Sequence, residues 1–212
     1  QIAPCFRDED PRADRSPGEF YQCDIEMSFV EQEDVFKVGE ELLSKVFGAF
    51  AKEPVTPAPF VRFTYEDFMN SFGSDKPDLL NPLRIKNVSE VFANTEFQVF
   101  KGVLAEKGAI HAIALPKMTA PPRKYFDDTI ELFKKWSGQG VAYVIVEEGG
   151  WRGTVAKFFS PAEQQQLTAL LTLEAGQIVF FGAGQSKFLL PHLGRLLSKF
   201  ADDFSLRTGG YH

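Results

Sequence analysis

The sequence predicts an α+β fold in two parts. Patterns typical of strands alternate with patterns typical of helices along the 212 residues. Residues 33–52 carry apolar side chains at the three- and four-residue spacing of one helical face. Residues 83–205 interleave further strands and helices, which favours a compact α+β module. With 44% hydrophobic residues, a chain of this length can bury one good core or two modest ones.

Composition excludes several classes of protein. The formal net charge of −6 argues against a general binder of nucleic acids or membrane surfaces, which would need a positive field. Two cysteines are too few for a disulfide framework and favour a reducing, cytoplasmic compartment. No run approaches the about 18 apolar residues of a membrane span, and no signal peptide opens the chain, so no membrane partner is expected. A first residue of Gln and the ending Thr208–His212 suggest a piece of a longer protein.

An antiparallel strand pair is predicted at the start of the chain. Residues 2–9 and 19–30 alternate or run apolar on either side of a charged stretch, as strands joined by a polar loop would. The strongest helical pattern follows at 33–52. Its apolar positions are Val35, Phe36, Val38, Leu42, Leu43, Val46, Phe47 and Phe50.

Short elements follow this helix. Three prolines between residues 54 and 59 break it, and residues 60–63 are predicted as a short strand. Thr64 and Asp67 have the spacing of a capping box that opens a short helix. This helix ends at the glycine that begins Gly73–Asp78, a stretch rich in turn residues.

The turn-rich stretch is the predicted joint between domains. We assign residues 1–82 to a first domain, residues 83–205 to the α+β module and residues 206–212 to a tail. In the module, Ser89 is expected to cap a short helix, and residues 98–104 and 109–115 to form a hairpin. The remaining predicted elements are a helix over 122–136, strands over 141–146 and 155–158, a helix capped by Ser160 and Glu163, a strand over 178–181 and a last helix from Ser186.

The stretch FRDEDPRADR at residues 6–15 holds four acids and three arginines between the two predicted strands. Side chains two apart share a strand face, so Arg7 and Glu9 lie together on the first strand. A polar face with an arginine, an aromatic ring and carboxylates suits a ligand that carries a phosphate, a flat ring and an amine. A salt-bridged surface hairpin would show the same charge pattern, and that pattern alone leaves both interpretations open. On the second strand the polar face would hold Phe20, Gln22, Asp24 and Glu26, and the packed apolar face Tyr21, Cys23, Ile25 and Met27.

Residues 1–15, continuing into Glu19–Gln22, resemble motif 2 of the class II aminoacyl-tRNA synthetases, and more narrowly that of the bacterial aspartyl-tRNA synthetases. Gly73–Leu79 is similar to a second segment of the bacterial enzymes. The resemblance implies part of the antiparallel class II catalytic sheet, followed by the module that these enzymes insert between motifs 2 and 3. Similar strings in that module are Arg123-Lys124, Gly140-Val141-Ala142-Tyr143, Ala156-Lys157-Phe158 and Phe180-Phe181-Gly182-Ala183.

The resemblance implies roles for residues on the polar face. Arg7 would be catalytic, holding the α-phosphate of ATP and the carboxylate of aspartate. Asp8 and Glu9 would lie beside the nucleotide, and Phe20 would stack under the adenine. The aspartate pocket would contain Arg7, Gln22 and Asp24, with Asp24 binding the ammonium group. Asp10, Arg12 and Arg15 would meet the acceptor end of the tRNA, on a loop that Ser16-Pro17-Gly18 makes slightly long.

For the longer parent enzyme, the resemblance implies an aspartate–tRNA ligase. It would activate L-aspartate with ATP and Mg²⁺, and would transfer the product to tRNA(Asp), with tRNA(Asn) as a possible second acceptor. The parent is expected to be a cytoplasmic homodimer. The anticodon-binding barrel, the dimerisation helix and the motif 3 arginine of the family are not found in this sequence, so the fragment alone is expected to be inactive and to bind no cofactor tightly. The alternative is a non-catalytic docking or tRNA-binding module.

Other residues have ordinary structural explanations. His111 lies in a predicted strand and is expected to be a core or rim histidine. Cys23 is expected to be a small thiol in the packed face. No Cys/His spacing suggests zinc, so no metal site is predicted from these side chains. Gly182–Gly184 lacks the third glycine and the lysine of a phosphate-binding loop.

Overall fold

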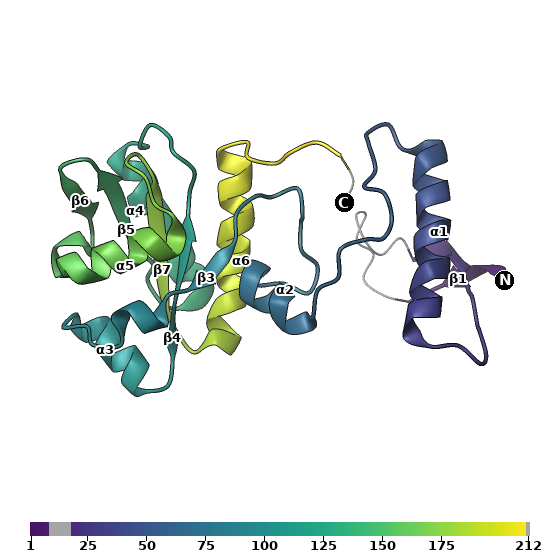
Figure 1. Ribbon diagram of the computed structural model, residues 1–212, viewed down its shortest axis with the longest axis horizontal. Helices are drawn as coiled ribbons and strands as arrows, with labels where there is room; N and C mark the ends of the chain where they lie inside the picture. Colours follow the sequence, from purple (N-terminus) through teal and green to yellow (C-terminus); the bar gives the residue numbers. More distant parts are fainter. Residues whose placement is uncertain (9–17, 211–212) are drawn as a thin grey trace. The chain divides into compact units, whose positions relative to one another are not determined.

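The computed structural model describes residues 1–8 and 18–210, and the chain divides into two compact units, Gln1–Phe60 and Val61–His212 (Figure 1). Both helices and antiparallel strands are present, which confirms the α+β prediction. Among the described residues, no helix is long and apolar enough to span a membrane.

The first unit contains a two-stranded antiparallel sheet and one long helix. Strand β1 (Ile2–Phe6) pairs with β2 (Glu19–Cys23). Helix α1 (Gln32–Phe50) confirms the predicted helix, and the Asp34 carboxylate accepts a hydrogen bond from the Glu31 N–H at its start (3.1 Å). No residue of α1 is buried in the described chain, and Phe50 is 83% exposed. The apolar stripe of α1 is therefore largely open to solvent in this part of the protein.

Residues 60–63 do not form the predicted strand. The Phe60 N–H donates to the Glu40 carboxylate at 3.0 Å, where a strand would donate to a neighbouring backbone carbonyl. In the described chain no strand pairs with this segment. The apolar residues of 60–63 suit a strand, but a strand also needs a neighbouring strand to pair with. The local sequence does not show whether such a partner is present.

The second unit is built on one five-stranded antiparallel sheet. The strand order is β3-β4-β7-β5-β6, so the central strand β7 comes from late in the sequence and pairs on both sides with earlier strands. The strands are β3 (Ile85–Asn87), β4 (Ala109–Ala114), β5 (Ala142–Glu147), β6 (Gly150–Gly153) and β7 (Ile178–Gly184). The helices are α2 (Tyr65–Phe72), α3 (Gln98–Ala105), α4 (Arg123–Ser137), α5 (Pro161–Leu171) and α6 (Ser186–Asp203), with 3₁₀ turns at Ser89–Phe92 and Ala156–Phe158.

Each face of the sheet has its own core. Adjacent residues Phe180 and Phe181 of β7 point to opposite faces, as strand alternation requires. Phe180 packs with α4 and α6, where Phe126 and Phe200 are fully buried. The opposite core lies under α3, α5 and the two 3₁₀ turns. Its buried members include Val88, Phe92, Phe100, Val144, Phe159, Leu167, Val179 and Phe181.

Helix α2 packs within the second unit, against α6. Its capping box is confirmed, because the Asp67 N–H donates to the Thr64 hydroxyl at 3.1 Å. The helix ends at Gly73 with φ +65°, in the left-handed region that favours glycine. A Cβ at Gly194 of α6 would lie 2.5 Å from the Phe72 carbonyl oxygen, so the two backbones touch. The compact second unit begins at Val61, before both the predicted joint at Gly73–Asp78 and the domain limit drawn after residue 82, while the division of the parent enzyme into those domains stays a prediction.

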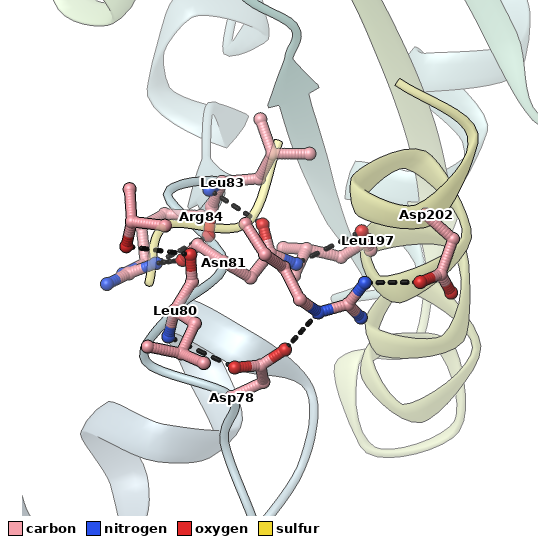
Figure 2. A network of polar contacts seen from close by, with 9 residues as sticks. Asp78, Leu80, Asn81, Leu83, Arg84, Leu197 and Asp202 are labelled. Carbon is pink, nitrogen blue, oxygen red and sulfur yellow. Dashed lines mark hydrogen bonds and ion pairs between the residues drawn. The ribbon is translucent and has the colours of Figure 1, made fainter. Parts of the chain in front are cut away.

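Residues 78–84, between the turn-rich stretch and β3, are fixed by a polar network that includes residues of α6 (Figure 2). Asn81 is completely buried. Its amide donates to the Leu197 carbonyl at 3.2 Å and accepts from the Leu83 N–H at 3.0 Å. Arg207 bridges Asp78 and Asp202 in a pair of ion pairs. Asp78, at the end of the predicted joint, and the residues that follow it are therefore held in place by side chains from both ends of the unit.

Residues 98–104 form helix α3 and not the predicted hairpin strand. Phe97 and Phe100 share the spacing of one helical face and pack edge to face in the second core (4.9 Å between ring centroids). Lys107 has φ +57°, and the Gly108 N–H donates to the Val103 carbonyl at 2.9 Å. Lys107 and Gly108 thus terminate a helix and do not form the turn of the predicted hairpin.

Two further expectations need correction. The strand predicted at 155–158 lies earlier, at β6, because Gly153 (φ +138°) turns the chain into a 3₁₀ turn that places Val155 in the core. Ser89 lies inside its short helix and does not cap it. Its hydroxyl instead accepts from the Ile110 N–H at 2.9 Å, which ties the turn to β4.

The strand predicted at 19–30 ends at Cys23, because among the described residues 24–30 only Asp24 has a further backbone partner in β1 or beyond its end, the Gln1 carbonyl. The remaining predicted elements are confirmed, with small shifts at their ends. Helices α4 and α6 and strands β5 and β7 lie where the patterns placed them. Ser160 and Glu163 form the expected capping box of α5. His111 is a core histidine, 2% exposed, and its Nε2 lies 3.1 Å from the Ser186 hydroxyl. Burial lowers the pKa of His111 to about 4.

Substitution of Gly194 by Ala should destabilise the second unit by about 1–3 kcal/mol, since the new methyl group would collide with the backbone of Phe72. The matched control is Gly102→Ala in α3, where a Cβ meets nothing within 4 Å, so a gain of about 0.5–1 kcal/mol is expected. Urea unfolding of the 212-residue chain measures both changes. Equal effects of the two substitutions would contradict the close packing of α2 on α6.

His111 should make stability depend on pH. Its pKa is lower in the folded state than in the unfolded state, so the stabilisation is complete above about pH 6.5 and is lost as the pH falls toward 4. The expected loss is roughly 3 kcal/mol. His111→Gln should flatten the dependence between pH 6.5 and 4. An unchanged slope in the His111 variant would show that other groups cause it.

Candidate active-site hairpin

The β1–β2 hairpin is the candidate site, and its register is fixed by backbone hydrogen bonds. Cys5 lies opposite Phe20, and the Arg7 N–H donates to the Gly18 carbonyl at 2.8 Å, one residue beyond β1. At the other end, the Asp24 N–H donates to the Gln1 carbonyl at 2.8 Å. The ladder therefore extends past the strands at both ends.

One face of this ladder carries the predicted ligand-binding side chains. Alternate residues share a face, so Arg7 and Cys5 lie with Phe20, Gln22 and Asp24. The Arg7 guanidinium carbon lies 5.1 Å from the centroid of the Phe20 ring, within the range of a cation–π contact. The hairpin thus brings together a cation, an aromatic ring, an amide and a carboxylate, as the two-residue period predicted.

The opposite face is exposed, which overturns the expectation that it packs. Ile2, Phe6 and Tyr21 are 76%, 73% and 75% exposed. Cys23 is also exposed, so its prediction as a core thiol is wrong for the described part of the chain. Two strands alone cannot cover an apolar face, and in the described chain nothing shields these side chains. Ile25 and Met27 are likewise exposed.

Several predicted site residues cannot be compared with the geometry. Glu9, Asp10, Arg12 and Arg15 lie outside the described residues. Asp8 is described and is exposed, directly after the last backbone pair of the hairpin.

Sequence reasoning missed Cys5. This half-buried residue lies opposite Phe20 on the candidate face, and its Sγ is 3.8 Å from the Gln22 Oε1. The two-residue period of a strand places Cys5 on the same face as Arg7, and that period is the signal in the sequence that identifies it.

The described residues contain no group of three or more His, Cys, Asp or Glu side chains that could hold a metal ion.

Comparison with known proteins places this hairpin in a family. The family model for "tRNA synthetases class II (D, K and N)" matches residues 1–191. The chain belongs to the class II tRNA synthetases. The match begins with the candidate hairpin and continues through most of the second unit, which agrees with the resemblance found from the motif 2 residues.

Curated relatives of this class II synthetase chain are named aspartate–tRNA(Asp/Asn) ligases. An aspartate–tRNA(Asp/Asn) ligase of Chlorobium phaeobacteroides (strain BS1) is 43% identical over 206 residues, which are 97% of this chain and 34% of the relative. A protein of the same name from Rickettsia bellii (strain OSU 85-389) is 42% identical over 207 residues, with the same coverage. The chain thus spans about a third of the length of the curated relatives it matches.

Proposed function

We propose that this class II synthetase chain is the part of an aspartate–tRNA ligase that carries the hairpin for ATP and aspartate. The proposal rests on one observation: the side chains of Arg7, Phe20, Gln22 and Asp24 lie on the same face of the hairpin. A surface hairpin without a ligand has no need to present these four side chain types together. The names and the identity of the relatives support the same activity.

Arg7 would act on the first half-reaction. A carboxylate oxygen of aspartate attacks the α-phosphorus of ATP, pyrophosphate leaves, and aspartyl-adenylate forms. Negative charge accumulates on the oxygens of that phosphorus, and a guanidinium can donate two hydrogen bonds to them. A positive group already in place stabilises this charge more in the transition state than in the substrates.

The other three side chains would hold the substrates. Phe20 offers a ring on which adenine can stack. In the structure the Arg7 guanidinium stands over that ring, so a purine stacked on the same side would take its place and Arg7 would turn toward the phosphate. Asp24 offers an exposed carboxylate for the ammonium group of aspartate, and Gln22 lies beside it on the face.

The second half-reaction involves the loop between the strands. Asp10, Arg12 and Arg15 would meet the acceptor end of tRNA(Asp), and also of tRNA(Asn) if the double specificity in the relatives' names extends to this protein. The full-length ligase would be a cytoplasmic homodimer that uses Mg²⁺ with ATP.

Substitution of Arg7 by Ala in the full-length ligase should lower aspartate-dependent exchange of pyrophosphate into ATP by roughly 100- to 1,000-fold. The loss should appear in kcat, because the guanidinium acts most strongly in the transition state.

The matched control for Arg7→Ala is Arg123→Ala. Arg123 lies on the surface of α4, where its side chain pairs with Asp127 at 3.7 Å. Its replacement should leave exchange unchanged. Near wild-type exchange in the Arg7 variant would refute the catalytic assignment.

The loop arginines should matter chiefly for tRNA. We expect Arg12→Ala and Arg15→Ala to lower transfer of aspartate to tRNA by roughly tenfold to 100-fold, since each removes a charged hydrogen-bond donor. Pyrophosphate exchange should change little. Equal losses in the two half-reactions would mean that these arginines serve the nucleotide.

The 212-residue chain alone should fold across its second unit yet show no synthetase activity. The second unit has its own two-sided core, whereas the hairpin is a two-stranded ribbon of marginal stability. Calorimetry with ATP and aspartate, together with pyrophosphate exchange, measures this. Exchange above background would show that the missing parts of the ligase are dispensable for activation. Tight tRNA binding without exchange would favour the docking module instead.

A further inference from the structure

Cys5 occupies the middle of the proposed substrate face. It lies two residues before Arg7, directly opposite Phe20 and diagonally from Gln22 across the strand pair. Its side chain is half-buried, whereas Cys23, the other cysteine of the chain, is exposed on the opposite face. The hairpin therefore carries one thiol on each face, and only one of them adjoins the residues proposed to bind substrates.

The Cys5 thiol can orient the Gln22 side chain. Its Sγ lies 3.8 Å from the Gln22 Oε1 and 3.7 Å from the Ala3 carbonyl oxygen, and both distances suit a hydrogen bond from sulfur. A thiol has one proton to donate, while a side-chain amide has an accepting end and a donating end. When Cys5 donates to Oε1, the donating Nε2 of Gln22 is turned away from Cys5.

We propose that Cys5 is a positioning residue for the aspartate substrate, through its contact with Gln22. This inference rests on the proposed function. With Oε1 held by the thiol, Nε2 is free to donate to a carboxylate oxygen of aspartate. Asp24, on the same face, accepts from the ammonium group, so the two neighbouring side chains recognise groups of opposite charge on one amino acid.

The size of Cys5 fits this role. With Ala3 opposite Gln22 and Cys5 opposite Phe20, the β1 side of the face presents two small side chains between Gln1 and Arg7. A larger residue at position 5 would fill the space beside the Phe20 ring and the Gln22 amide. Serine preserves both the small volume and the donor, whereas alanine preserves only the small volume.

The test compares Cys5→Ala and Cys5→Ser in the full-length ligase by pyrophosphate exchange. Cys5→Ala should raise the KM for aspartate roughly threefold to tenfold, as expected for one lost hydrogen bond, and should leave the KM for ATP unchanged. Cys5→Ser should restore the aspartate KM to within about twofold of the wild-type value. Cys23→Ala, on the opposite face, is the matched control and should change neither constant.

Two results would overturn the proposal. One is a KM for aspartate in Cys5→Ala that equals the wild-type value. The other is a parallel rise in both KM values in the Ala and Ser variants, which would indicate a structural role for Cys5. Both are distinguishable from a failure of the proposed function, because a protein that is not an aspartate–tRNA ligase would show no aspartate-dependent exchange even without substitution, whereas an authentic ligase would show exchange that Arg7→Ala lowers.

A second measurement tests the contact in the 212-residue chain itself. Alkylation by N-ethylmaleimide, followed by mass spectrometry of the two cysteine peptides, gives the labelling rate of Cys5 relative to Cys23. Gln22→Ala removes the acceptor and uncovers the thiol, so the relative rate at Cys5 should rise roughly twofold to tenfold. A relative rate equal to that of the unsubstituted chain would show that Cys5 and Gln22 do not interact.

Discussion

The antiparallel register of β1 and β2 determines which side chains meet on the hairpin. Cys5 is paired with Phe20, and the Arg7–Gly18 hydrogen bond of 2.8 Å extends that pairing to the edge of the loop. A slip of one residue would move one strand's side chains to the other face and would separate Arg7 from Phe20. The cation–π contact, the position of Gln22 and the proposed substrate face all depend on this register.

The alternation of side chains between the two faces of a strand also organises the second unit, where both faces of the sheet are buried. Phe180 and Phe181 enter different cores, and each core is closed by its own helices. The first unit lacks such support, since α1 and one hairpin face remain exposed among the described residues. A class II synthetase chain that spans about a third of its relatives' length can therefore contain one self-sufficient unit and one whose apolar surfaces are uncovered.

Sequence patterns predicted the structure correctly where the residues that form the feature lie close together in the sequence. The capping boxes at Thr64 and Ser160 and the apolar period of α1 each need only neighbouring residues, and all three are found. The period of two likewise gathered Arg7, Phe20 and Gln22 on one face. The roles of these residues came from the resemblance to class II synthetases, because spacing alone also suits a salt-bridged hairpin.

The failures share a cause in tertiary context. Residues 98–104 have apolar side chains that suit a strand or a helix, and the packing of Phe100 in the second core selects the helix. Residues 60–63 lack a partner strand in the described chain, and the face of Tyr21 lacks a covering layer there. A local sequence pattern does not reveal either absence, since the partner strand and the covering layer would both come from other segments of the protein.

The most direct measurement is alkylation of the full-length ligase in the presence and absence of a non-hydrolysable aspartyl-adenylate analogue. If the face of Arg7 and Phe20 binds the adenylate, the analogue should slow the labelling of Cys5 and leave the labelling of Cys23 unchanged. Labelling of Cys5 at the same rate with and without the analogue would contradict this, as would protection of Cys23 alone.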